Sequence, residues 1–275
     1  MKLIATLALC YVGIVALLYF AQGWLLFPGA GLPSRPLDSP RQPERLELPT
    51  GSGPVLHGML FPARTAATDL LIGFGGNAQD AEMLGQDLAA DFPNLHVAAF
   101  HYRGYGPSTG RPSEAALLED ARAIHDVLVS RLAAERTFAI GISLGSAIAA
   151  HLSKERPLAG VILVTPFDSI EAVAKEAYFW VPVGPLLRHR FPTVEFMSGN
   201  PTPVAVIAAG QDRVIRPRRT AALVERLENL VFYRVLEGAD HNTLYQVPIY
   251  EETLNAAFAA ISGAATEPAE RVSAN

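Results

Sequence analysis

The strongest constraint on this fold is the alternation of short, almost uninterrupted apolar runs with longer segments of helical periodicity. Apolar runs of this kind are typical of strands that are covered on both faces of a sheet. Strands that alternate with helices along a chain form a mostly parallel, doubly wound α/β sheet. We therefore expect eight strands, over residues 45–49, 55–61, 69–74, 96–101, 137–140, 160–165, 204–209 and 232–236.

The segments between the apolar runs carry stripes with the spacing of amphipathic helices. One stripe continues from Leu117 to Leu132, and Ser113 is placed to cap the helix at its start. Comparable stripes predict further helices around residues 84–92, 217–230 and 247–261. Residues 171–200 fit neither pattern. They form either a short cap over a pocket or an amphipathic helix followed by an irregular loop.

The N-terminal segment, residues 1–27, is apolar almost throughout, with no charged residue between Lys2 and Arg35. About 20 such residues suffice to span a bilayer as a helix. The alternative is a signal peptide cleaved near residues 21–23, but apolar residues continue beyond that site, which favours an uncleaved anchor. The positive charge of Lys2 favours an N-terminus that stays in the cytoplasm. The rest of the chain is therefore expected outside the cytoplasm. It would lie in the periplasm if the organism is a bacterium, or be secreted if the segment is cleaved.

The remaining boundaries follow from composition. Residues 28–43 contain five prolines and predict an extended spacer, and residues 263–275 predict a polar tail. The domain between them covers residues 44–262. The net charge of −5 argues against a nucleic-acid partner. The single cysteine, Cys10, leaves no disulfide to form within the chain, and the histidine spacing gives no metal site.

The sequence Gly141-Ile142-Ser143-Leu144-Gly145 lies between an expected strand and an expected helix. Glycines at both ends permit the sharp turn that exposes a serine hydroxyl at the edge of a sheet. Polar residues after later strands complement it, because Asp212 and His241 follow in the order serine, acid, histidine. A serine hydroxyl needs a base, an imidazole can serve as one, and a carboxylate holds that imidazole in one tautomer. Asp168 also follows a strand and is the rival acid.

Such a nucleophile needs donors for the oxyanion that forms on the substrate. A glycine-rich stretch, residues 73–78, follows the third expected strand, and its Asn77 is predicted to supply one backbone N–H. The backbone N–H of Leu144, directly after Ser143, is predicted to supply the other. These donors and the three side chains require no metal or cofactor.

With these motifs the chain resembles the α/β-hydrolase-fold serine hydrolases, and within them the membrane-anchored, bud-emergence-like branch. The resemblance covers roughly residues 24–250, and the matching stretches are GGNAQD, HYRGYGPSTGRPSE, GISLG, TPFDSI, GQDRVI and GADHN. It implies the α/β-hydrolase fold, an N-terminal anchor and hydrolysis of esters or thioesters, and it favours Asp212 over Asp168 as the acid. The chain departs from the family pattern at Gly75, where a histidine is usual, and at Gln79, where a glycine is usual; we expect an altered rigidity of this loop.

The sequence therefore predicts a serine hydrolase that cleaves carboxylic esters or thioesters through an acyl-enzyme. Its substrate would be a small-molecule or lipid-like acyl ester, and its N-terminal helix would contact a membrane. Two alternatives stay open. One is a membrane-tethered binding protein that keeps the fold without the activity, and the other is an acyltransferase in which an alcohol intercepts the acyl-enzyme.

Overall fold

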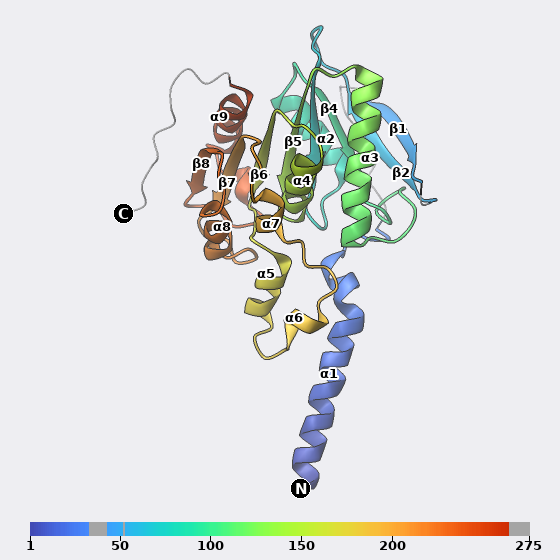
Figure 1. The fold of residues 1–275 in the computed structure, drawn as a ribbon, viewed down its shortest axis with the longest axis vertical. Helices are drawn as coiled ribbons and strands as arrows, with labels where there is room; N and C mark the ends of the chain where they lie inside the picture. Colours follow the sequence, from blue (N-terminus) through green and yellow to red (C-terminus); the bar gives the residue numbers. More distant parts are fainter. Residues whose placement is uncertain (33–42, 52, 264–275) are drawn as a thin grey trace.

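A computed structural model describes residues 1–32, 43–51 and 53–263. Eight strands form one sheet in the spatial order β1-β2-β4-β3-β5-β6-β7-β8 (Figure 1). The pairs from β4 through β8 are parallel, whereas β2 runs antiparallel to both of its neighbours. The strands are β1 (Glu44–Pro49), β2 (Val55–Phe61), β3 (Asp69–Phe74), β4 (His96–Phe100), β5 (Arg136–Ile142), β6 (Gly160–Val164), β7 (Val204–Ala209) and β8 (Leu230–Leu236).

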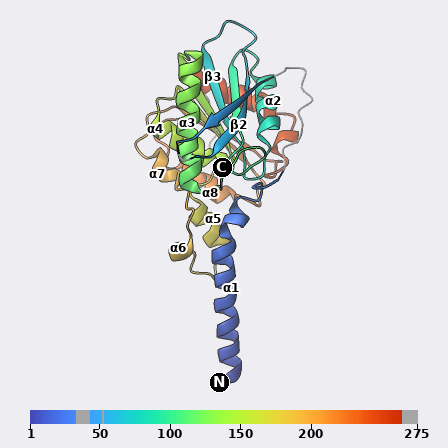
Figure 2. The same ribbon diagram turned by 90° about the vertical axis from the view of Figure 1, so that its right-hand side faces the viewer.

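Helices cover both faces of the sheet, and the two views in Figures 1 and 2 show the resulting layers. Successive side chains of a strand point to opposite faces of the sheet. Leu70 and Ile72 of β3 therefore belong to one apolar cluster, and Leu71 belongs to the other. The first cluster is covered by α3 (Glu114–Leu132), α4 (Leu144–Glu155), α7 (Thr193–Met197) and α8 (Pro217–Val224). The second is covered by α2 (Ala81–Asp91) and α9 (Tyr250–Ser262).

The expected doubly wound fold with eight strands is confirmed, and the differences lie at the ends of elements. Ser113 caps α3 as predicted, because its hydroxyl accepts a hydrogen bond from the N–H of Ala116 at 3.2 Å. The helix expected over 217–230 ends earlier, because α8 stops at Val224, and Leu230 instead begins β8 and pairs with Val204. The helix expected from residue 247 begins at Tyr250, since a residue before a proline disfavours the helical conformation and position 248 is proline.

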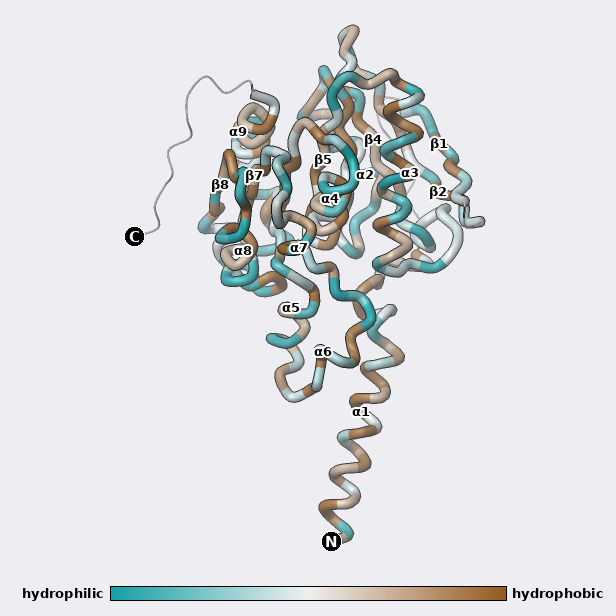
Figure 3. Tube along the Cα trace, viewed as in Figure 1, coloured by the Kyte–Doolittle hydropathy of each residue, from teal (hydrophilic) through white to brown (hydrophobic). Residues whose placement is uncertain are grey.

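The N-terminal helix α1 (Lys2–Leu26) projects from the sheet, and Figure 1 shows α5 (Ile170–Ala177) and α6 (Val183–Leu186) beside it. Figure 3 shows that α1 is apolar along most of its length. Residues 171–200 thus form short helices that extend beyond the sheet edge before α7 returns to pack on α4. We call the part from Ile170 to Phe191 the cap.

The junction between the expected anchor, which ends at Phe27, and the expected spacer, which begins at Pro28, packs on the domain. Phe27 is fully buried, and Ala30 forms an isolated bridge with Tyr105 in the loop after β4. The apolar ring of Phe27 is the physical reason, because its burial favours docking of this stretch. Residues 33–42 of that spacer and 264–275 of the expected tail lie outside the described residues.

Candidate active site

Ser143 is the single residue between the end of β5 and the start of α4. Its φ is +50°, a left-handed conformation that a non-glycine residue adopts at an energetic cost and that often marks a functional site. There is no room for a side chain at either glycine of this turn. A Cβ at Gly141 would lie 2.2 Å from the carbonyl oxygen of Gly145, and one at Gly145 would lie 2.0 Å from that of Phe74. Glycine is therefore required at both positions for this turn to form.

The structure brings His241 and Asp212 to this serine from two other loops. His241 Nε2 lies 3.0 Å from Ser143 Oγ, and His241 Nδ1 lies 2.6 Å from Asp212 Oδ2. Asp212 is held by its other oxygen, since Oδ1 accepts hydrogen bonds from the N–H groups of Val214 at 2.8 Å and Ile215 at 2.7 Å. Three side chains that are far apart in the sequence thus form one hydrogen-bonded chain at the carboxyl ends of β5, β7 and β8.

The rival acid, Asp168, faces other partners. Its Oδ2 accepts a hydrogen bond from Arg219 at 3.0 Å, and its Oδ1 accepts one from the N–H of Ser169. Burial raises the pKa of Asp168 above its ordinary value, with these donors acting in the opposite direction. The carboxylate hydrogen-bonded to His241 is therefore that of Asp212, whereas Asp168, in the loop after β6, forms an ion pair with Arg219 of α8.

The glycine-rich loop after β3 lies directly beside the serine. A Cβ placed on Gly76 would be 3.8 Å from the Cβ of Ser143. The carbonyl of Gly76 accepts a hydrogen bond from the N–H of Gln79 at 3.2 Å. In a trans peptide the C=O and N–H point in opposite directions, so this bond orients the N–H of Asn77 away from Gln79. On the other side of the serine, Leu144 is the first residue of α4, where N–H groups have no carbonyl partner within the helix.

Two tyrosines fix the same loop through its carbonyl groups, and these contacts are not apparent from the sequence pattern. The hydroxyl of Tyr102 donates to the carbonyl of Gly75 at 2.6 Å, and that of Tyr105 donates to the carbonyl of Asn77 at 2.8 Å. Burial raises the pKa of both tyrosines above the ordinary value, so both remain donors at physiological pH. Gln79 adds a further constraint, because its Oε1 accepts from the N–H of Gly76 at 3.0 Å.

Arg103 braces the loop after β4 through a buried ion pair with Asp120. Its Nε donates to Asp120 Oδ2 at 2.8 Å, its Nη2 also contacts Asp120, and both side chains are almost fully buried. Burial raises the pKa of Asp120, while the hydrogen bonds from Arg103 act to lower it. This ion pair connects α3 to the loop that carries Tyr102 and Tyr105. Together these residues explain why that loop has a defined position beside the candidate site.

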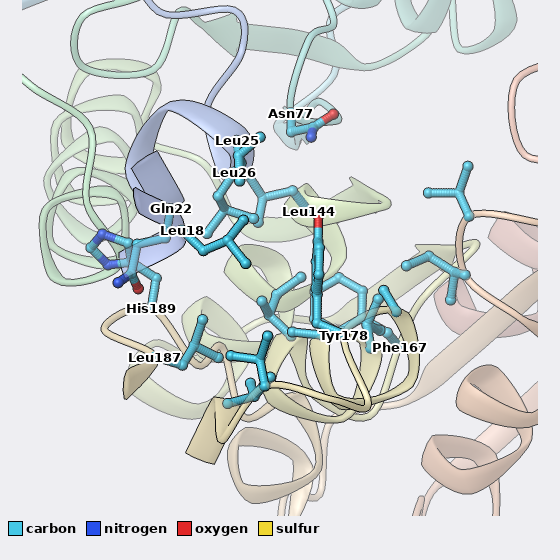
Figure 4. Close-up of a pocket in the computed structure, with 18 of the residues that line it drawn as sticks. Leu18, Gln22, Leu25, Leu26, Asn77, Leu144, Phe167, Tyr178, Leu187 and His189 are labelled. Atoms are coloured by element: carbon cyan, nitrogen blue, oxygen red, sulfur yellow. The ribbon is translucent and has the colours of Figure 1, made fainter. Parts of the chain in front are cut away.

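Two hollows meet at Ser143 and His241. One, of about 490 Å³, extends between α1 and the cap, and Figure 4 shows several of the mostly apolar side chains that line it. The other, of about 860 Å³, lies on the side of the loop after β3 and includes polar side chains. These polar residues include Gln79, Asp80, Asp87, His101 and Asn242. The site therefore has one apolar side and one side of mixed polarity.

Comparison with known proteins connects this geometry to a family. A family model described as serine aminopeptidase, S33, matches residues 67–202, which include Asn77 and Ser143 but not Asp212 or His241. An uncharacterized protein of Mycobacterium tuberculosis is 33% identical over 248 residues, which cover 88% of each chain. The alpha/beta hydrolase domain-containing protein 17B of Xenopus laevis is 31% identical over 167 residues, covering 58% of this chain and 55% of that protein.

Solved structures show the same fold at low sequence identity. An esterase of Pyrococcus furiosus superposes with a TM-score of 0.65 and 15% identity, covering 82% of this chain and 94% of the esterase. An alpha-beta hydrolase of Vibrio vulnificus gives a TM-score of 0.64 with 17% identity over 78% of this chain and 81% of that one. The sheet order, the turn at Ser143 and these similarities lead to one conclusion: the chain belongs to the alpha/beta hydrolase family.

Proposed function

We propose that the protein is a serine hydrolase that cleaves carboxylic esters or thioesters through an acyl-enzyme. The observation that carries the proposal is the hydrogen-bonded chain from Asp212 through His241 to Ser143, at a point where two hollows meet. The apolar hollow suits an acyl chain, and the mixed hollow suits the alcohol or thiol that leaves.

Each residue then has a defined role in the reaction. Ser143 Oγ attacks the acyl carbon while its proton passes to His241 Nε2, which lies 3.0 Å away. Asp212 accepts the hydrogen bond from Nδ1 and stabilises the imidazolium that forms. The oxyanion accepts hydrogen bonds from the N–H groups of Asn77 and Leu144, and each such donor contributes about 3 kcal/mol of barrier lowering.

The intermediate collapses when His241 returns the proton to the leaving alkoxide or thiolate, and the acyl group stays on Ser143. Water then attacks the acyl-enzyme, with His241 Nε2 accepting its proton. The second oxyanion forms at the same place and is held by the same donors. Collapse releases the carboxylic acid, and the proton returns to Ser143.

We further infer that α1 anchors the protein in a membrane, as in the bud-emergence-like branch. Its 25 residues would extend over about 37 Å at 1.5 Å per residue, whereas the hydrocarbon core of a bilayer is about 30 Å thick. None of its side chains is fully buried by the protein, which supports contact with lipid. The charged N-terminus at Lys2 favours a domain outside the cytoplasm.

The proposal is tested with the full-length protein in detergent micelles. A fluorophosphonate probe should label the wild type, and Ser143→Ala should abolish both labelling and turnover of p-nitrophenyl butyrate. Ser198→Ala makes the same chemical change at an exposed serine and should retain both. Labelling that persists in Ser143→Ala, or butyrate turnover that persists within tenfold of wild type, would refute the assignment.

A further inference from the structure

Helix α1 presents two different faces along its second half. Val15, Leu18 and Gln22 recur at helical spacing and are half-buried against the protein, whereas Leu17 and Phe20 are 67% and 77% exposed. A simple tether needs no buried face. This pattern shows that α1 is a packed element of the protein as well as an apolar segment.

The cap is hydrogen-bonded to the buried face of α1. Gln22 Nε2 donates to the carbonyl of Leu186 at 3.2 Å, and Gln22 Oε1 accepts from the N–H of Arg188 at 2.8 Å. Nearer the N-terminus of the helix, the hydroxyl of Tyr11 donates to the carbonyl of Trp180 at 2.9 Å. A glutamine packed among apolar side chains is costly unless both its polar groups are paired. The cap pairs them, so α1 and the cap form one unit.

The apolar hollow lies within this unit and ends at the candidate nucleophile. It is lined by Val15, Leu18 and Leu26 of α1 on one side, by residues of the cap on the other, and by Ser143 and His241 at its inner end. Figure 4 shows Leu18 and Leu26 from α1 and Tyr178 and Leu187 from the cap around this space. Removal of α1 would remove one wall.

We propose that this hollow binds the acyl chain of the substrate, that α1 is one of its walls, and that the substrates are long-chain acyl esters or thioesters drawn from a lipid bilayer. This proposal rests on the proposed function and specifies its substrate class. The chain would lie between α1 and the cap with its carbonyl carbon at Ser143 Oγ, and the polar part would lie in the hollow of mixed polarity.

The position of the cap beside the membrane-spanning part of α1 is the reason to expect that the substrate comes from a bilayer rather than from water. The guanidinium of Arg188 lies 5.3 Å from the ring of Tyr19, and arginine and tyrosine side chains are typical of the membrane–water interface. Residues 2–18, on the N-terminal side of Tyr19, extend over about 26 Å, which is close to the thickness of the hydrocarbon core of a bilayer. Tyr11 lies about 12 Å below Tyr19 by the same rise, so its partner Trp180 reaches the same depth.

The tip of the cap is suited to that position. Phe179 is 84% exposed and Trp180 is 41% exposed, and Trp180 packs edge-on against Tyr11 with ring centroids 6.3 Å apart. Exposed aromatic side chains are costly in water and favourable in the interfacial and acyl regions of a bilayer. An acyl chain can therefore pass from the bilayer into the hollow without crossing water.

The test narrows the hollow from the side of α1. In the full-length protein in detergent micelles, we compare kcat/KM for p-nitrophenyl palmitate and p-nitrophenyl butyrate. Leu18→Trp should lower the palmitate-to-butyrate ratio at least about tenfold, since small changes of fit in an apolar pocket are worth about 10- to 200-fold. Leu17→Trp adds the same ring on the exposed face and should leave both the ratio and the butyrate turnover at wild-type values.

The outcomes separate this inference from the proposed function. A wild type that neither reacts with the fluorophosphonate nor cleaves butyrate refutes the proposed function. A wild type that cleaves butyrate but shows the same palmitate-to-butyrate ratio in Leu18→Trp refutes the acyl site at α1. Labelling by the fluorophosphonate at the wild-type rate shows that Leu18→Trp is folded, so a lowered ratio in that variant reports chain binding.

Discussion

Asp212→Asn tests the candidate site because its effect follows from fixed hydrogen bonds. Asp212 Oδ1 accepts from two backbone N–H groups, those of Val214 and Ile215, and an amide must keep its oxygen there. The NH₂ group of asparagine then replaces Oδ2 and faces His241 Nδ1. Two donors cannot share that contact, so His241 is driven to the tautomer with its proton on Nε2. In that tautomer Nε2 cannot accept the proton of Ser143.

The magnitude follows from the loss of the base. A triad with the wrong tautomer loses about 10⁴-fold in kcat, which corresponds to about 5.4 kcal/mol of transition-state stabilisation. Steady-state turnover of p-nitrophenyl butyrate measures kcat, and thermal denaturation measures the fold, which the isosteric change should leave intact. Asp168→Asn is the matched control on the rival acid and should keep kcat within about threefold, because it removes an ion pair away from Ser143. Asp212→Asn with kcat within tenfold of wild type, or a greater loss in Asp168→Asn, would refute this reasoning.

Two further predictions concern the loop beside the serine and the pH dependence of stability. Tyr105→Phe removes the donor to the carbonyl of Asn77; kcat should fall about 2- to 10-fold with KM little changed, and an effect on KM alone would contradict a positioning role. Asp91 has a pKa raised to about 6 by burial and then by neighbouring carboxylates, so the folded state binds more protons than the unfolded state between about pH 4 and 6. Its contribution to stability is therefore full below about pH 4 and lost as the pH rises through 6. Asp91→Asn should raise Tm at pH 7.5 and leave it unchanged near pH 3.5, and equal shifts at both pH values would count against this sign.

The fold was predictable where local pattern and burial agree. β2, β3 and β7 have the expected bounds because each is a mostly apolar run bounded by polar or turn residues. The pattern failed where a helical stripe continued into a strand, since Leu230 satisfies both periodicities and its pairing with Val204 decides between them. Sheet pairing is a property of the whole fold and cannot be read from one segment.

The candidate site was predictable as a set of residue types but not as a set of supports. Chain order and the ends of strands identified the serine, acid and histidine. The contacts from Tyr102 and Tyr105 to the glycine-rich loop cross 27 and 28 residues of sequence, and those from Gln22 to the cap cross more than 160. Such contacts depend on which loops meet. A glutamine inside an apolar segment was the one visible signal of the packed face of α1.

A crystal structure of the full-length protein after reaction with a long-chain alkyl fluorophosphonate would identify the nucleophile and the acyl site together. We expect phosphorus bonded to Ser143 Oγ, a phosphoryl oxygen within hydrogen-bond distance of the N–H groups of Asn77 and Leu144, and the alkyl chain against Leu18 of α1. Phosphorus on a different residue, or an alkyl chain directed into the hollow of mixed polarity, would contradict this expectation.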